Sequence, residues 1–108
     1  MRSLRPIPLR LLAEDAVVRV PDGTGGYAEG VTVSHVRFVQ TQSVVDDNHR
    51  NADAGSGKVY VDALNSDGAF EVPAGSRIDI GGHSYLVAEC KRCEDFNGRV
   101  HHWELVVR

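Results

Sequence analysis

The stretch Gly82–Arg108, GHSYLVAECKRCEDFNGRVHHWELVVR, decides the fold. Its two alternating runs are joined by a turn at Glu94–Gly98, which predicts a long β-hairpin. Asn97-Gly98 favours a two-residue type I′ turn because both residues tolerate a positive φ. Trp103, the only Trp, is the largest apolar side chain of the chain and should anchor the core. Both faces of the hairpin carry apolar residues, which is typical of a small barrel or sandwich.

Further strands are expected upstream of the hairpin, and helical periodicity is almost absent. A β-bulge is expected near Ser34-His35, because the apolar residues before and after this pair differ in phase. The chain is therefore predicted to be all-β, a small single-domain β-barrel or sandwich of five to seven antiparallel strands. The expected strands are Glu14–Val20, Gly30–Gln42, Lys58–Leu64 and Arg77–Ile80, with a short strand or packed loop at Phe70 and Val72. The predicted structural core is Phe38, Ile78, Ile80, Tyr85, Val87, Trp103 and Leu105.

Length and charge narrow the class of protein. The 108 residues suit one domain, and 42% hydrophobic with 25% charged residues is ordinary for a globular protein. A net charge of −3 argues against a dedicated nucleic-acid binder. The charge is uneven, since residues 1–10 hold three Arg and no acid, whereas residues 11–89 hold five bases and twelve acids. A basic tail on an acidic body suits docking to a neighbouring subunit, and a solvated tail is the alternative.

Two segments lie outside the strand pattern. Residues 1–13 form a predicted N-terminal arm before the domain 14–108, because Pro6 and Pro8 favour an extended chain and Leu9–Ala13 allows one helical turn. The leucines of this arm either cap the end of the domain or insert into a partner. Residues 43–57, SVVDDNHRNADAGSG, have no periodicity, and we expect a long mobile loop that folds against a partner. A tolerated surface insertion is the alternative.

The sequence shows neither a membrane-spanning segment nor a secretory signal, and this bears on the expected compartment of the protein and on the redox state of its cysteines. No apolar run approaches the roughly 18 residues of a membrane span. The start MRSLRPIPLRLL lacks the apolar core and cleavage site of a secretory signal. We therefore expect a cytosolic origin, no membrane partner, and no structural disulfide between Cys90 and Cys93.

The group most similar to a metal site is Cys90 and Cys93 with His101 and His102. Strand geometry argues against it, because Cys90 and Cys93 point to opposite faces of one strand. Across the turn, Cys93 should lie opposite His102, and Cys90 opposite Leu105. We predict no metal and no cofactor. A small metal-stabilised binding module using these four side chains is kept as the alternative function.

A catalytic site is not predicted. His101 and His102 occupy adjacent strand positions and should face opposite ways, so they are not expected to act as an acid–base pair. No GxSxG or comparable nucleophile turn is present. The glycine pairs at 25–26 and 81–82 lack the helix that a phosphate-binding loop requires. A stand-alone enzyme is the least favoured interpretation.

Three segments resemble the minor capsid proteins of tailed bacteriophages and prophages. They are Arg5-Pro-Ile-Pro with Arg10-Leu-Leu, the run GSRIDIGGHSY that begins at Gly75, and HHWEL beginning at His101. They occur in the same order from residue 5 to the end. These small proteins belong to the head-to-tail module and are similar to head-completion or stopper-like head–tail connector proteins.

The resemblance implies a non-enzymatic virion structural protein of the head–tail interface, assembled in the bacterial cytoplasm. Such a barrel adds as a ring below the portal or adaptor, extends the DNA channel and receives the tail. Its implied partners are the portal or adaptor ring, tail proteins, copies of itself, and packaged DNA that passes without sequence-specific binding. A minor structural role without gating is the alternative.

The resemblance also suggests which residues face the partners. The partner- or channel-facing loop would comprise Val44, Val45, Asp46, Asp47, Asn48, His49, Arg50 and Asp53. The basic charge of the N-terminal residues separately suggests a partner-docking arm, which would comprise Arg2, Arg5, Leu9 and Arg10. The aspartates of the loop would repel DNA, which helps a gate to keep DNA from sticking.

Overall fold

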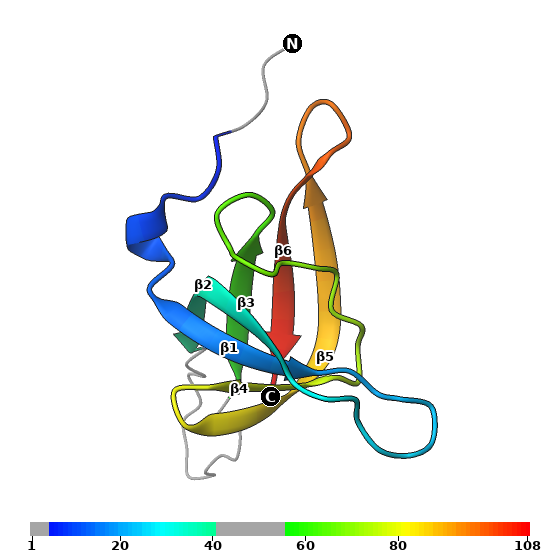
Figure 1. Ribbon diagram of the computed structural model, residues 1–108. Coiled ribbons are helices and arrows are strands. Elements are labelled where there is room, and N and C mark those ends of the chain that lie inside the picture. The colour runs from blue at the N-terminus through cyan, green and yellow to red at the C-terminus, as the bar shows by residue number, and fades with distance from the viewer. Residues whose placement is uncertain (1–4, 41–55) are drawn as a thin grey trace, which may run out of the picture.

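The computed structural model describes residues 5–40 and 56–108. Neighbouring strands pair antiparallel in the order β1-β2-β3-β6-β5-β4, and β1 also pairs with β4, so the sheet closes into a barrel (Figure 1). The predicted all-β barrel is thereby confirmed. No helix among the described residues is long and apolar enough to cross a membrane. The elements are the 3-10 turn η1 (Leu9–Leu11) and the strands β1 (Glu14–Arg19), β2 (Val31–Gln40), β3 (Gly57–Asp62), β4 (Arg77–Ile80), β5 (His83–Glu94) and β6 (Val100–Val107).

The barrel interior is filled by alternate side chains of every strand. On β3 and β6, Val59 lies opposite Leu105 and Val61 opposite Trp103, all buried. Burying a side chain of this size contributes about 1.5–3 kcal/mol. The buried cluster comprises Ala16, Val18, Val33, Val36, Val59, Val61, Val72, Ile78, Ile80, Tyr85, Val87, Trp103, Leu105 and Val107, with Phe38 packed against it half-buried.

Strand β2 carries the expected bulge at Ser34-His35. These two residues lie opposite the single residue Asp15 of β1, and His35 has a left-handed φ of 63°. A bulge bends its strand and increases the twist. The first half of β2 consequently pairs with β1 and the second half with β3, which turns the corner that closes the barrel.

The turn between β5 and β6 differs from the prediction. Of its residues, only Gly98 has a positive φ, at 80°, so a type I′ turn over Asn97-Gly98 is wrong. The Gly98 N–H donates to the Asp95 carbonyl at 3.2 Å, and the Asp95 carboxylate accepts the N–H groups of Asn97 and Arg99. This Asp95 cap favours the longer loop, with glycine at the left-handed position.

The predicted register of the hairpin is nevertheless right. Cys93 lies opposite His102 and Cys90 opposite Leu105. Nearer the turn, Glu94 pairs with Val100, so His101 is an extra residue in β6. This second bulge compensates for the longer turn.

The N-terminal segment is attached to the barrel through Asp62, the last residue of β3. The Asp62 carboxylate is fully buried and accepts the N–H groups of Ile7, Leu64 and Asn65 at 2.8–2.9 Å. The Asn65 side chain in turn donates to the Ile7 carbonyl. Leu12, just after η1, is buried as well. The last residues of the arm therefore pack on the barrel.

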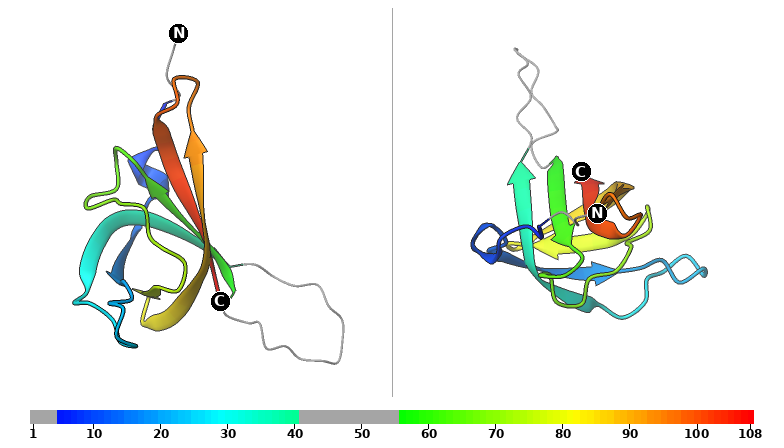
Figure 2. Two further views of the ribbon diagram at one scale, coloured as in Figure 1. Left: turned by 90° about the vertical axis from the view of Figure 1, so that its right-hand side faces the viewer. Right: turned by 90° about the horizontal axis from the view of Figure 1, so that it is seen from above.

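The two ends of the barrel differ. Strand β5 pairs with β4 only as far as Leu86, and its remaining half extends with β6 past one end of the barrel (Figure 2). The overhanging half of β5 carries exposed charged residues, which discourage pairing with another strand. At the other end, Gln40 of β2 pairs with Gly57 of β3. Segment 41–55 therefore starts and finishes at adjacent positions.

Candidate functional site

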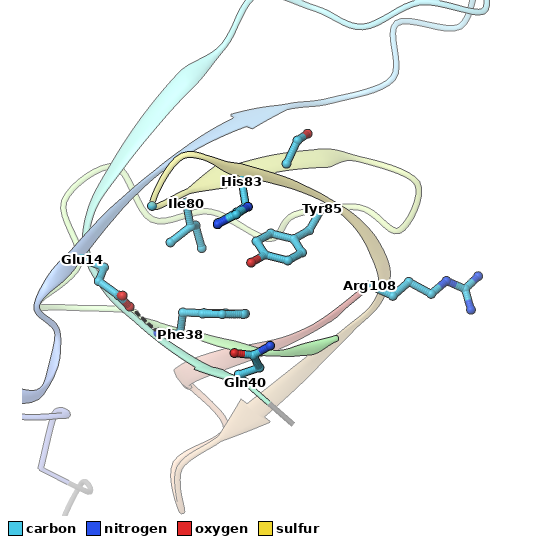
Figure 3. A pocket seen from close by; sticks show the side chains of 9 residues that line it. Glu14, Phe38, Gln40, Ile80, His83, Tyr85 and Arg108 are labelled. Carbon is cyan, nitrogen blue, oxygen red and sulfur yellow. Dashed lines mark hydrogen bonds between the residues drawn. The ribbon is translucent and has the colours of Figure 1, made fainter. Parts of the chain in front are cut away.

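A hollow of about 570 Å³ lies at the end of the barrel where β2 finishes. Phe38 and Tyr85 face each other there with ring centroids 5.2 Å apart, and His83 lies 6.3 Å from Tyr85 (Figure 3). The Glu14 carboxylate accepts the N–H of Phe38 at 2.8 Å. The hollow combines the apolar side chains of Phe38, Ile80 and Tyr85 with polar and charged ones. None of the hydrogen bonds given for its described lining residues joins a nucleophile to a base. The lining residues are Glu14, Phe38, Gln40, Ile80, Gly81, His83, Ser84, Tyr85 and Arg108.

The opposite end carries exposed apolar side chains. Leu64, after β3, is 76% exposed, and Phe96, at the tip of the β5–β6 hairpin, is 70% exposed. Leu9 in η1 is also exposed. A shallow hollow of about 140 Å³ lies beside them, lined by the N-terminal segment at Pro6 and by the root of the hairpin at His101.

His101 and His102 do not face opposite ways, and that expectation is wrong. Their Nδ1 atoms are 2.9 Å apart, and their rings lie edge to face at 5.1 Å between centroids. The reason is the bulge, because an extra residue in β6 breaks the alternation of side chains. The other nitrogen of His101, Nε2, contacts the carbonyl oxygen of Arg5. The pair of histidines therefore joins the arm to the hairpin.

A second polar group lies on the outer face of the hairpin. His102 Nε2 is 3.4 Å from a Glu104 carboxylate oxygen, and Cys93 Sγ is 3.8 Å from the same oxygen. One ligand atom from each of the three residues lies within 4.8 Å of the others. Cross-strand pairing brings Cys93 to His102, and Glu104 follows two positions later on the same face. The Lys58 ammonium approaches the other oxygen of Glu104 at 3.8 Å.

The two thiols have separate environments. Burial raises the pKa of the Cys90 thiol, which packs against the core and contacts the backbone of Val72. Burial, with the nearby Glu104 carboxylate, raises the pKa of the Cys93 thiol. The structure therefore does not gather all four candidate metal ligands, Cys90, Cys93, His101 and His102, around one point. The group that it does bring together is Cys93, His102 and Glu104.

The residues predicted to face partners are only partly described. Arg5 supplies the carbonyl that His101 contacts, while Leu9 and Arg10 lie exposed in η1. Arg2 and the loop residues Val44, Val45, Asp46, Asp47, Asn48, His49, Arg50 and Asp53 lie outside the described residues. Sequence reasoning missed Glu104, whose only signal was its position two residues after His102 on the strand.

The described residues thus form a small closed β-barrel with exposed apolar side chains at one end. A family model described as "Minor capsid protein" matches residues 18–107. The search of curated proteins and the search of solved structures returned no match. The chain therefore belongs to the minor capsid protein family of phages, and it is a structural component of the virion. The predicted resemblance is confirmed.

Proposed function

We propose that this minor capsid protein is a non-enzymatic subunit of the head–tail joint. It adds as a ring below the portal or adaptor, helps to close the DNA channel and receives the tail. One observation carries the proposal: the two ends of β3 lead to two different surfaces. The arm is bound at Asp62, and segment 41–55 joins β3 at the other end, beside Gly57. A ring subunit between two partners needs two such separate surfaces.

The arm end fits the docking surface. Leu9, Leu64 and Phe96 are exposed there on short loops and on η1. Large apolar side chains on loops are typical of protein–protein contacts, and aromatic residues are enriched in interface cores. The basic residues Arg5 and Arg10 of the arm add a charge that suits an acidic neighbour.

The other end fits the channel. The segment between Gln40 and Gly57 includes Asp46, Asp47 and Asp53, and we assign its residues to the channel wall. Carboxylates repel the phosphates of DNA, so such a wall lets the genome pass without binding it. The predicted partners follow, namely the portal or adaptor ring, tail proteins and further copies of this chain.

Electron microscopy of phage particles lacking this protein tests the proposal. We expect heads that lose their DNA and tails that remain unattached, with both defects restored by the gene supplied in trans. Supplying a variant in which residues 43–55 are replaced by a Gly-Ser linker of equal length, with Gly57 kept, separates the two roles. That variant should restore tail attachment and leave DNA retention impaired. Filled, tailed particles in the absence of the protein would refute the assignment.

A further inference from the structure

We propose that Cys93, His102 and Glu104 form a Zn²⁺ site on the outer face of the β5–β6 hairpin. Thiolate, imidazole and carboxylate are the three side-chain ligands that zinc takes in proteins. All three residues are half-buried, and they come from two paired strands whose register is fixed by the core. The inference is independent of the position of the protein in the virion.

The distances suit a single tetrahedral ion. Zinc–ligand bonds of about 2.0–2.3 Å place neighbouring ligand atoms roughly 3.3–3.8 Å apart. The Glu104 oxygen lies 3.4 Å from His102 Nε2 and 3.8 Å from Cys93 Sγ. All three atoms are within 4.8 Å of one another, so adjustment of side-chain rotamers alone completes the geometry. Three protein ligands leave a fourth position for water or for a group from a neighbouring subunit.

The hydrogen bonds behind His102 set its tautomer. A carbonyl oxygen only accepts hydrogen bonds, so His101 Nε2 carries the hydrogen that it donates to Arg5. In the neutral ring, His101 Nδ1 is then an acceptor and takes the hydrogen on His102 Nδ1, 2.9 Å away. In that tautomer His102 Nε2 carries no hydrogen and can bind a metal ion. The Glu104 carboxylate 3.4 Å away only accepts hydrogen bonds, so a cation between the two atoms takes the place of the hydrogen that their direct contact would need. A metal-bound histidine is commonly held this way, with its second nitrogen donating to a fixed acceptor.

The charges around the group favour a cation once the thiol is ionised. Glu104 and the Cys93 thiolate together supply two negative charges. Coordination releases the Cys93 proton to solvent and forms the Zn–S bond, with no redox change. Lys58, 3.8 Å from the second oxygen of Glu104, balances part of the negative charge from the β3 side. Lys91 lies opposite Glu104 on β5.

Zinc titration of the full-length chain, stripped beforehand with a chelator, tests the site. We expect one Zn²⁺ per chain by elemental analysis and a higher melting temperature with zinc. Co²⁺ used as a probe should give a thiolate-to-metal charge-transfer band. Cys93→Ser, His102→Gln and Glu104→Gln should each weaken binding by at least about tenfold. His101→Phe, which removes the acceptor behind His102, should weaken binding about 10–100-fold.

Cys90→Ser is the matched control, because Cys90 faces the core on the same strand and should leave zinc binding unchanged. Circular dichroism of each metal-free variant checks that the barrel is folded. Absence of a charge-transfer band in the folded wild-type chain would overturn the proposal. Zinc binding that survives Cys93→Ser, or that is lost with Cys90→Ser in a folded chain, would overturn it equally.

Discussion

The Nδ1 atoms of His101 and His102 are 2.9 Å apart, although the two residues are neighbours on a single strand. Regular β-structure would direct their rings to opposite faces. The bulge at His101 turns both rings to one side and allows His101 to reach the carbonyl of Arg5. A turn one residue longer than the simplest hairpin thus produces a contact between the two ends of the chain.

Replacing His101 should loosen the N-terminal arm. His101→Phe keeps an aromatic ring but removes the donor to the Arg5 carbonyl, so we expect a loss of about 0.5–1.5 kcal/mol. Hydrogen exchange of the nearby Ile7 amide should become faster, measured by NMR. His83→Phe, at the other end of the barrel, should leave that exchange rate unchanged. An unchanged Ile7 rate in His101→Phe would contradict the contact.

Among the described polar residues, Asp62 should lose the most folding stability when it is substituted. Asp62→Ala leaves the N–H groups of Ile7, Leu64 and Asn65 without their acceptor, and we expect at least about 2 kcal/mol of lost stability. Urea unfolding followed by Trp103 fluorescence measures the change. Asp67→Ala, on an exposed loop residue, should change stability by less than about 0.5 kcal/mol. Equal effects of the two substitutions would disprove the anchoring role of Asp62.

Gly57 should not accept a methyl group. A Cβ at this position would lie 2.5 Å from the Val39 carbonyl oxygen and 2.7 Å from the Phe38 ring. Gly57→Ala should therefore cost about 1–3 kcal/mol through overpacking at the start of β3. Gly26→Ala is the control, because its nearest neighbour would be an Asp22 oxygen at 3.5 Å. Thermal unfolding of both variants compares them, and a Gly57→Ala protein as stable as wild type would contradict the close approach.

The Arg19–Asp79 ion pair should make a small contribution to the free energy of unfolding that is lost at acidic pH. The Arg19 guanidinium holds the pKa of the Asp79 carboxyl below its ordinary value of 3.8. Because the folded-state pKa is the lower one, the pair stabilises the fold above about pH 3.8 and loses this effect as the pH falls through the folded-state pKa. Both side chains are partly exposed, so the contribution is below about 1 kcal/mol.

A double-mutant cycle over a pH series measures this pair. Asp79→Asn should remove the whole pH-dependent part of the unfolding free energy that Asp79 contributes, and Arg19→Gln should remove the largest share of it. The double variant should remove no more than Asp79→Asn does. A coupling energy that is constant from pH 6 to about pH 2 would be inconsistent with the assigned cause.

Phe96 should matter for assembly and little for folding. Because its side chain is mostly exposed, Phe96→Ser should change stability by less than about 0.5 kcal/mol. If the hairpin tip docks on a neighbour, the variant should be incorporated into virions less than wild type, measured by quantitative blotting of purified particles. Tyr27→Ser, an exposed aromatic position on the β1–β2 connection, is the matched control. Equal incorporation of all three proteins would remove Phe96 from the docking surface.

Much of the barrel could be predicted from alternation alone. The strand at Arg77–Ile80 and the bulge at Ser34-His35 follow from the phase of apolar residues, and the structure has both. The register that sets Cys93 opposite His102 was also right, although the turn type was wrong. Two departures from a regular hairpin compensate for each other in the β5–β6 turn. The Asp95 cap makes the turn one residue longer, and the extra residue His101 in β6 restores the predicted pairing.

The polar clusters could not be predicted in the same way. Strand periodicity assumes regular alternation, and a bulge overturns it at the residues where the histidines meet. The side chain of Glu104 joins His102 only because β6 is regular again after the bulge. Pairing of β1 with β4, which closes the barrel, links strands about 60 residues apart and leaves no local signal.

The pairing of Gln40 with Gly57 has a practical consequence for engineering. When the two ends of a loop are held side by side, the entropic free-energy cost of closing the loop rises slowly with its length, by about 0.6 kcal/mol for each doubling. Inserts such as an epitope tag or a fluorescent reporter between these two positions should therefore be tolerated by the barrel. The isolated protein could then be labelled at this site without redesign of the barrel.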